Sequence, residues 1–253
     1  MRDKSDYTHT VDVFIERKIG VNDPWYQLIL KMFDARFQFQ GKKILEVGCG
    51  LGGFCIKLAE KGTDSIGLDI SRNAIKKAKD LAKRCNVENQ VEFLIGDAHF
   101  LPFKTESYSS VICSETLEHV DDYEQAFNEI VRIVENQGQI CITLPNLLST
   151  MFPVYIFLLV MGQPKYAKNF LNVEKEGVFH YFKIKKLFNR NDLEVIRIQS
   201  TDFLYLPPRV KNLFKIERHL KIMSDSIEDY VERYNLGLKY LGANIGVLAR
   251  KIQ

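Results

Sequence analysis

Glycines and a carboxylate stand together in one short segment, Lys42–Gly53, which reads KKILEVGCGLGG. An apolar stretch in it, Ile44–Val47, carries Glu46 and runs into a turn that holds four glycines: Gly48, Gly50, Gly52 and Gly53. Glycine tolerates positive φ and lets a ligand lie against the backbone. If a helix follows, its first N–H groups have no internal partners and point outward. The segment therefore predicts a binding site for a polar, partly anionic ligand.

Two ligands fit this spacing. Gly48, Gly50 and Gly53 satisfy the Gly-x-Gly-x-x-Gly fingerprint of nicotinamide dinucleotides. An acidic residue that could hold a ribose, Asp69, follows about twenty residues later. Glu46 favours the second ligand, S-adenosylmethionine, because a carboxylate in a buried strand is costly unless it meets a donor or a cation. S-adenosylmethionine brings an ammonium and a sulfonium, whereas a dinucleotide brings a pyrophosphate that the carboxylate would repel.

Further polar residues stand at the ends of other expected strands. Asp69 ends Ser65–Asp69, Asp97 follows Val91–Gly96, and Ser114 ends Tyr108–Ser114. Strand and helix patterns alternate five times, which predicts a parallel, doubly wound sheet. Ligands of such sheets bind outside the carboxyl ends of the strands. These polar residues are therefore expected at one edge of the sheet, beside the glycine turn.

The pattern apolar–acidic–apolar–Gly-x-Gly-x-Gly resembles motif I of the class I S-adenosylmethionine-dependent methyltransferases, and more narrowly the type 11, ubiquinone-pathway O-methyltransferases. The resemblance covers roughly residues 40–146 and implies S-adenosyl-L-methionine as cofactor. It implies that Asp69 accepts from the ribose hydroxyls and Asp97 from the adenine amino group. The cofactor-binding residues that we expect are Glu46, Gly48, Cys49, Gly50, Gly52, Asp69, Ile70, Asp97, Ala98 and Ser114.

The resemblance also implies the architecture. We expect an α/β fold with a doubly wound, mostly parallel, seven-stranded Rossmann-like sheet, an antiparallel last strand and helical lid insertions. Residues 1–40 would form an N-terminal helical cover, and 41–253 the methyltransferase domain, with lids at about 147–178 and 203–240. Expected helices are Trp25–Phe37, Phe54–Lys61, one capped by Ser71, Tyr123–Val134 and one near Lys183–Phe188. The last three expected strands are Gln139–Leu144, Glu194–Ser200 and Ala243–Lys251.

Two histidines are the expected catalytic residues. In the family, methyl transfer is an in-line displacement, and an oxygen acceptor needs its proton removed, for which an imidazole suits neutral pH. His119 follows the fourth strand, and His180 lies on a segment that returns over the pocket in this family. A structural role at a helix start is the alternative for His119. Glu115, Glu118, His119 and His180 also resemble the Mg²⁺ or Mn²⁺ sites of two metal-assisted branches, but we expect a metal-free site.

Composition and charge limit the possible partners and cellular location of the chain. The chain has 253 residues and a net charge of +3, so nothing global calls for nucleic acid. Its five cysteines include no Cys-x-x-Cys pair, which predicts reduced, mostly buried thiols in a cytoplasmic protein. Met1–Thr10 is polar and unlike a signal peptide. Leu147–Met161 is apolar but shorter than a bilayer span, and Lys211–Lys221 is basic and amphipathic. The first fits an ordinary lid or buried helix, or a segment that meets a lipid surface or an apolar acceptor. The second fits a helix with a solvated charged face, or one that meets anionic lipid or a phosphorylated acceptor.

The sequence thus predicts a methyltransferase for a small-molecule or lipid-like acceptor, with transfer to oxygen. Two alternatives stay open. An RNA or protein methyltransferase would show a basic surface continuous with the pocket. A non-catalytic S-adenosylmethionine-binding protein would tolerate a blocked pocket beyond the methyl group. Neither the acceptor nor the oligomeric state can be read from the sequence.

Overall fold

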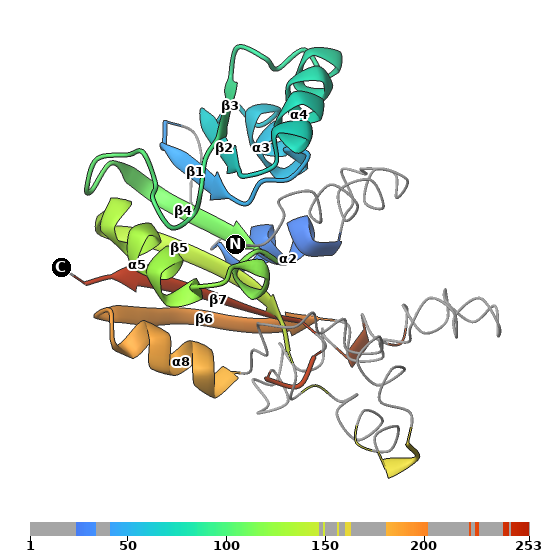
Figure 1. Cartoon of the computed structure of the whole chain (residues 1–253), viewed down its shortest axis with the longest axis vertical. Helices are drawn as coiled ribbons and strands as arrows, with labels where there is room; N and C mark the ends of the chain where they lie inside the picture. Colours follow the sequence, from blue (N-terminus) through green and yellow to red (C-terminus); the bar gives the residue numbers. More distant parts are fainter. Residues whose placement is uncertain are drawn as a thin grey trace.

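The computed structural model describes residues 24–33, 41–146, 181–201 and 244–252, with short pieces at 149, 156, 160–162, 223, 226–227 and 240–242. Figure 1 shows a sheet with helices on both of its faces. The strands are β1 (Ile44–Val47), β2 (Ser65–Asp69), β3 (Val91–Ile95), β4 (Tyr108–Ser114), β5 (Val134–Pro145), β6 (Leu193–Thr201) and β7 (Asn244–Lys251). The helices are α2 (Pro24–Met32), α3 (Gly53–Ala59), α4 (Arg72–Arg84), the 3₁₀ helix η1 (Leu117–His119), α5 (Tyr123–Ile133) and α8 (Tyr181–Asn189).

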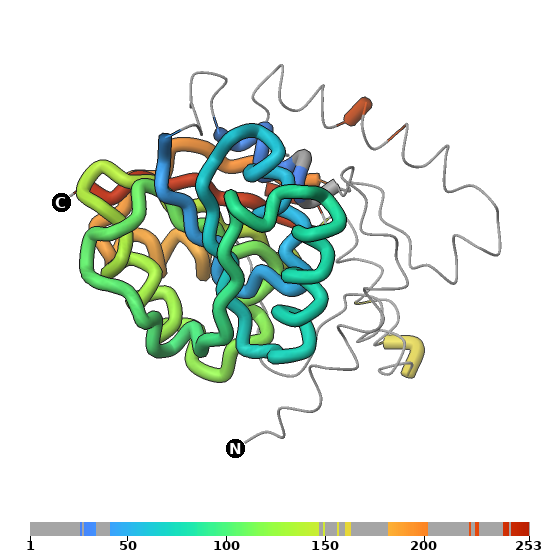
Figure 2. Tube along the Cα trace, turned by 90° about the horizontal axis from the view of Figure 1, so that it is seen from above, coloured from blue at the N-terminus to red at the C-terminus, as the bar shows by residue number. Residues whose placement is uncertain are grey.

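The sheet has seven strands in the order β3-β2-β1-β4-β5-β7-β6. Neighbours from β3 to β5 pair in parallel, and β7 runs antiparallel between β5 and β6. The chain starts in the middle with β1, winds out to β3, and then reverses to β4 on the other side of β1. Figure 1 shows β2 and β3 at one end of the sheet and β6 and β7 at the other, and in the view from above β7 (red) and β6 (orange) lie behind the blue and cyan strands (Figure 2). This confirms the expected doubly wound sheet with an antiparallel last strand and sets its switch point between β1 and β4.

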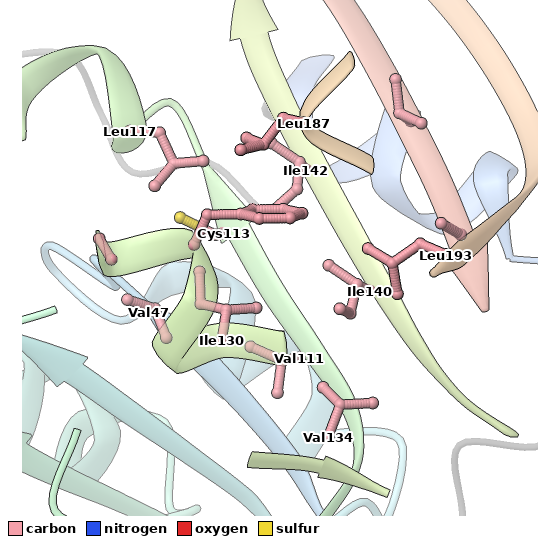
Figure 3. Packing of buried hydrophobic residues seen from close by; sticks show 14 of the residues in the cluster. Val47, Val111, Cys113, Leu117, Ile130, Val134, Ile140, Ile142, Leu187 and Leu193 are labelled. Atoms are coloured by element: carbon pink, nitrogen blue, oxygen red, sulfur yellow. The ribbon is translucent and has the colours of Figure 1, made fainter. Parts of the chain in front are cut away.

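Side chains of β1 alternate between the two faces of the sheet. Leu45 and Val47 belong to the cluster that α5 and α8 cover, whereas Ile44 packs with α2 and α3. In Figure 3, Ile130 of α5 lies beside Val47, and Leu187 of α8 lies beside the sheet residue Ile142. The face that carries α3 is the one to which Glu46 also points.

The α2 helix covers a face of the sheet. Leu28, Ile29 and Met32 of this helix, and Phe33 directly after it, are buried against the sheet and α3. The Arg197 guanidinium of β6 donates to the carbonyl of Lys31 at 2.6 Å and fastens the end of the helix. Of the predicted cover, 1–40, only 24–33 are described. The predicted lids fall almost entirely outside the described residues.

Other predictions held closely. The cysteines are all free, with Cys85 half-buried and the rest buried, as expected. Ser71 caps α4, since its hydroxyl accepts from the Ala74 N–H at 3.2 Å. The fifth strand was expected to begin at Gln139 but begins at Val134, which pairs with Tyr108 of β4. In the part of the chain that the structure describes, no helix is long and apolar enough to span a bilayer.

Candidate functional site

The turn after β1 uses its glycines in two different ways. Gly48, Gly50 and Gly52 have φ of 74°, 52° and 72°, which favours glycine at each position. A Cβ on Gly48 would overlap the side chain of Thr116, so this glycine lets β1 and the segment after β4 approach each other. A Cβ on Gly50 would meet nothing within 4 Å. Gly50 therefore faces open space, which leaves room for a ligand against the backbone.

Asp69, at the end of β2, holds this turn in place. One carboxylate oxygen, Oδ2, accepts from the Gly50 N–H at 2.8 Å, and Oδ1 accepts from the Ser71 N–H at 2.8 Å. Burial raises the pKa of Asp69, and the two N–H donors oppose part of that rise. Each carboxylate oxygen has two acceptor positions, so a carboxylate with these bonds can still accept from ligand hydroxyls. Ile70 follows in the half-buried bend.

Glu46 lies directly beneath the turn and is 4% exposed. The donor that its buried carboxylate requires is internal: the Cys55 thiol donates to Oε2 at 3.0 Å, and the Cys55 N–H also bonds to the carboxylate. Burial raises the pKa of Glu46 to about 7, against the lowering effect of these bonds. Burial and the Glu46 charge also raise the pKa of the Cys49 and Cys55 thiols, which keeps both protonated. Contact of Glu46 with a ligand cation remains a prediction.

Asp97 and Ala98 follow β3, and both are half-buried. Oδ1 of Asp97 accepts from the backbone N–H of His99 at 3.0 Å and contacts His99 Nδ1 at 2.6 Å. The side chain of Asp97 is 39% exposed, so a ligand can reach it. Sequence reasoning gave His99 no role, although the Asp-x-His spacing was a local signal for this contact.

The end of β4 and the segment after it carry Ser114, an expected cofactor-binding residue, and His119, an expected catalytic residue. The Ser114 hydroxyl shares a hydrogen bond of 2.7 Å with Thr143 Oγ1 of β5. His119 ends η1; its N–H donates to the Thr116 carbonyl at 2.9 Å, and its side chain is 29% exposed. His119 is thus anchored through its backbone while its imidazole reaches the surface. The second predicted base, His180, lies outside the described residues.

Glu115 and Glu118, two of the residues that resemble a metal site, do not lie on one helix. Glu115 precedes η1 with a φ of 46°, and the helix begins only at Leu117. Glu118 is 8% exposed, and burial raises its pKa well above the usual range, with a further rise from the charge of Glu115. Within the described ranges, no group of three or more His, Cys, Asp and Glu could hold a metal ion.

Three of the predicted carboxylates therefore lie in or just after neighbouring strands of the sheet: Glu46 in β1, Asp69 at the end of β2 and Asp97 after β3. The first is buried beneath the turn, the second fixes the turn, and the third is open to solvent. Such a row of acceptors suits a ligand rich in hydroxyl, amino and cationic groups. It suits a pyrophosphate poorly, because like charges repel in a partly buried site.

Comparisons with known proteins agree with this geometry. A family profile described as "Methyltransferase domain" matches residues 38–192. Norajmaline N-methyltransferase from Rauvolfia serpentina is 37% identical over 93 residues, which is 36% of this chain and 32% of that protein. Tocopherol O-methyltransferase, chloroplastic, from Arabidopsis thaliana is 35% identical over 102 residues, 40% of this chain and 29% of that protein. This chain thus matches less than a third of the length of either relative.

A solved structure shares the fold over most of this chain. It is phosphoethanolamine N-methyltransferase 2 from Haemonchus contortus in complex with S-adenosyl-L-methionine. The TM-score is 0.58 at 20% identity, and the match covers 90% of this chain and 52% of that chain. At this identity the likeness concerns the fold alone.

Proposed function

This chain belongs to the class I S-adenosylmethionine-dependent methyltransferase family, and we propose that it transfers a methyl group from S-adenosylmethionine to an oxygen of a small-molecule or lipid-like acceptor. The observation that carries the cofactor assignment is the row of three carboxylates, Glu46 in β1, Asp69 at the end of β2 and Asp97 after β3. When bound, S-adenosylmethionine supplies a methyl group on a positively charged sulfur, which an acceptor can take by in-line displacement.

The chain's own residues would bind and orient that cofactor. Because Gly50 has no side chain, a ligand can lie directly against its backbone. Asp69 holds the turn in place by accepting a hydrogen bond from the Gly50 N–H. The remaining acceptor positions of Asp69 suit the paired hydroxyls of a ribose. Asp97, open at the end of β3, suits an amino donor. Glu46 supplies negative charge beneath the turn, on the side where an ammonium group would be attracted.

Transfer to oxygen is supported by His119. An oxygen acceptor must lose a proton during transfer, and an imidazole whose unperturbed pKa is ~6.5 can take it near neutral pH. His119 follows β4 at the switch point, and its half-buried ring reaches solvent. The named relatives include both O- and N-methyltransferases, so relatives do not choose between the two atoms.

A labelling screen tests the proposal. The purified chain is incubated with cell extract and cofactor that carries a labelled methyl group, and the products are separated into lipid, small-molecule, RNA and protein fractions. We expect label in the lipid or small-molecule fraction, and less of it with the Asp69→Ala variant when the cofactor concentration is below saturation. Label confined to RNA or protein would overturn the acceptor class. Cofactor binding without label in any fraction would favour a non-catalytic binding protein.

Peripheral contact with a membrane is a separate part of the proposal. Its support is the sequence of two segments, the apolar Leu147–Met161 and the basic Lys211–Lys221. Flotation with anionic liposomes at low salt tests it, because electrostatic attraction is least screened there. A chain that stays at the bottom of the gradient would remove this part and leave the transferase proposal standing.

A further inference from the structure

The geometry points to His99 as a positioning residue that fixes the Asp97 carboxylate for recognition of the adenine amino group and joins its loop to helix α5. The inference rests on the proposed function, because it needs an adenosyl ligand at the end of β3. His99 itself touches no reacting atom. It acts through Asp97.

The hydrogen bonds of the His99 ring define its protonation. The Asp122 N–H donates to Nε2 at 3.3 Å, so Nε2 carries no proton. The proton must then lie on Nδ1, which is 2.6 Å from Oδ1 of Asp97 and donates to it. The His99 ring thus joins the two elements, with its donor toward Asp97 and its acceptor toward the start of α5.

Asp97 receives two donors from the same residue. The His99 N–H and Nδ1–H both reach Oδ1, from the backbone and from the side chain. The two donors reach Oδ1 from different directions, so together they restrict rotation of the Asp97 carboxylate about its side-chain torsions. Because recognition of one amino group requires an acceptor held in place, this fixation favours adenine over a purine that lacks the group.

Helix α5 supplies the fixed reference for this loop. Beyond the Asp122 bond, the Gln125 side chain donates to the His99 carbonyl at 3.2 Å. Two residues further along the helix hold the next part of the loop. Glu129 accepts from the Leu101 N–H at 2.9 Å, and Arg132 donates to the Leu101 carbonyl at 3.0 Å while pairing with Glu129 at 2.6 Å. His99 is therefore the link between Asp97 and a loop that is already fastened at several points.

Two conservative variants separate the halves of this bridge. His99→Asn keeps a donor at the Nδ1 position, toward Asp97, and removes the acceptor for the Asp122 N–H. His99→Gln extends to the Nε2 position, where its carbonyl can accept from Asp122, and removes the near donor. Both variants keep the backbone bond to Asp97. The ligands are S-adenosylhomocysteine and its 6-desamino analogue, in which hydrogen replaces the adenine amino group.

The ratio of the two dissociation constants is the measurement, by titration calorimetry. In the wild type we expect the adenine ligand to bind roughly tenfold more tightly, the cost of one lost hydrogen bond at a partly buried carboxylate. His99→Asn should keep this ratio within about twofold, and His99→Gln should reduce it by about threefold or more. A merely structural residue would weaken both ligands equally, so an unchanged ratio in both variants would overturn the inference.

A measurement on the wild type does not depend on the stability of any variant. Nitrogen-15 NMR of the imidazoles, with His99 assigned by its absence in His99→Asn, should show Nδ1 protonated and Nε2 not. The opposite tautomer would overturn the inference. If the wild type binds no S-adenosylhomocysteine at all, the proposed function itself fails, and the inference fails with it.

Discussion

The Cys55 thiol donates a hydrogen bond to Oε2 of Glu46 at 3.0 Å, in a buried layer beneath the glycine turn. This contact satisfies an acidic residue in the first strand without any ligand. Because burial raises the pKa of Glu46 to about 7, the carboxylate can gain or lose its proton near neutral pH. A ligand cation at the turn would favour the deprotonated form, so ligand binding and the charge of Glu46 should be linked.

Cofactor affinity should therefore depend on pH through Glu46. The deprotonated carboxylate attracts the cofactor's cationic groups, so affinity should rise as pH rises through about 7 and level off above it. Glu46→Gln should flatten this dependence. Calorimetric titrations of S-adenosylmethionine between roughly pH 6 and pH 8 measure it in both proteins, and the cofactor's own titration is common to both. Equal pH slopes for wild type and variant would show that Glu46 takes no part.

Glu46 should also make stability depend on pH. Its pKa in the folded chain, about 7, lies above 4.5, the ordinary value for a glutamate, so between these values the folded chain binds a proton more tightly than the unfolded chain. Its contribution to the free energy of unfolding is complete below pH 4.5 and is lost as pH rises through 7. The loss approaches about 3 kcal/mol. In urea unfolding at acidic and alkaline pH, Glu46→Gln should lose less stability than the wild type over this window.

Asp69→Ala tests the carboxylate that bridges the turn. The variant leaves the Gly50 and Ser71 N–H groups without their acceptor and removes the predicted ribose contact. We expect the free energy of S-adenosylmethionine binding, measured by titration calorimetry, to weaken by about 1–3 kcal/mol. The free energy of unfolding should fall by less than this. The control is Asp80→Ala on the exposed side of α4. A fall in affinity of the same size in both variants would contradict a specific role for Asp69.

Gly50 and Gly62 form a matched pair for the open face of the turn. Both have positive φ, 52° and 77°, and a Cβ at either would meet nothing within 4 Å. Alanine should therefore cost similar backbone strain, about 1–2 kcal/mol, at both positions. Only Gly50→Ala should also weaken S-adenosylmethionine, because only Gly50 lies at the site. Binding that survives Gly50→Ala as well as Gly62→Ala would mean that no ligand lies against Gly50.

The positions of strands could be predicted where the sequence itself marks both the strand and its end. β1, β2 and β4 have the expected bounds, because each is a short apolar run that ends at polar or turn residues. β5 begins earlier than expected, at Val134. Its early part is polar and exposed, and it is a strand because Val134 pairs with Tyr108, a partner distant in sequence. Such pairing leaves no local pattern.

In the candidate site, too, some features could be predicted from the sequence and others could not. The carboxylates at strand ends were predictable, since chain order and strand direction bring Asp69 and Asp97 to one edge. The bridge from Asp97 through His99 to Asp122 was not, because Asp122 lies 23 residues from His99 and meets it only when α5 packs on the sheet. The donor for Glu46 was likewise hidden. Cys55 is part of α3, and it reaches the carboxylate because this helix packs on the face of the sheet to which Glu46 points.

A direct comparison of two ligands tests the central claim, that the carboxylate row selects S-adenosylmethionine. The wild-type chain is titrated by calorimetry with S-adenosylmethionine and, separately, with NAD, under identical buffer and salt. The account predicts saturable binding of S-adenosylmethionine and of its demethylated product, with no binding of NAD at the same concentrations. Tighter binding of NAD than of S-adenosylmethionine would contradict the account.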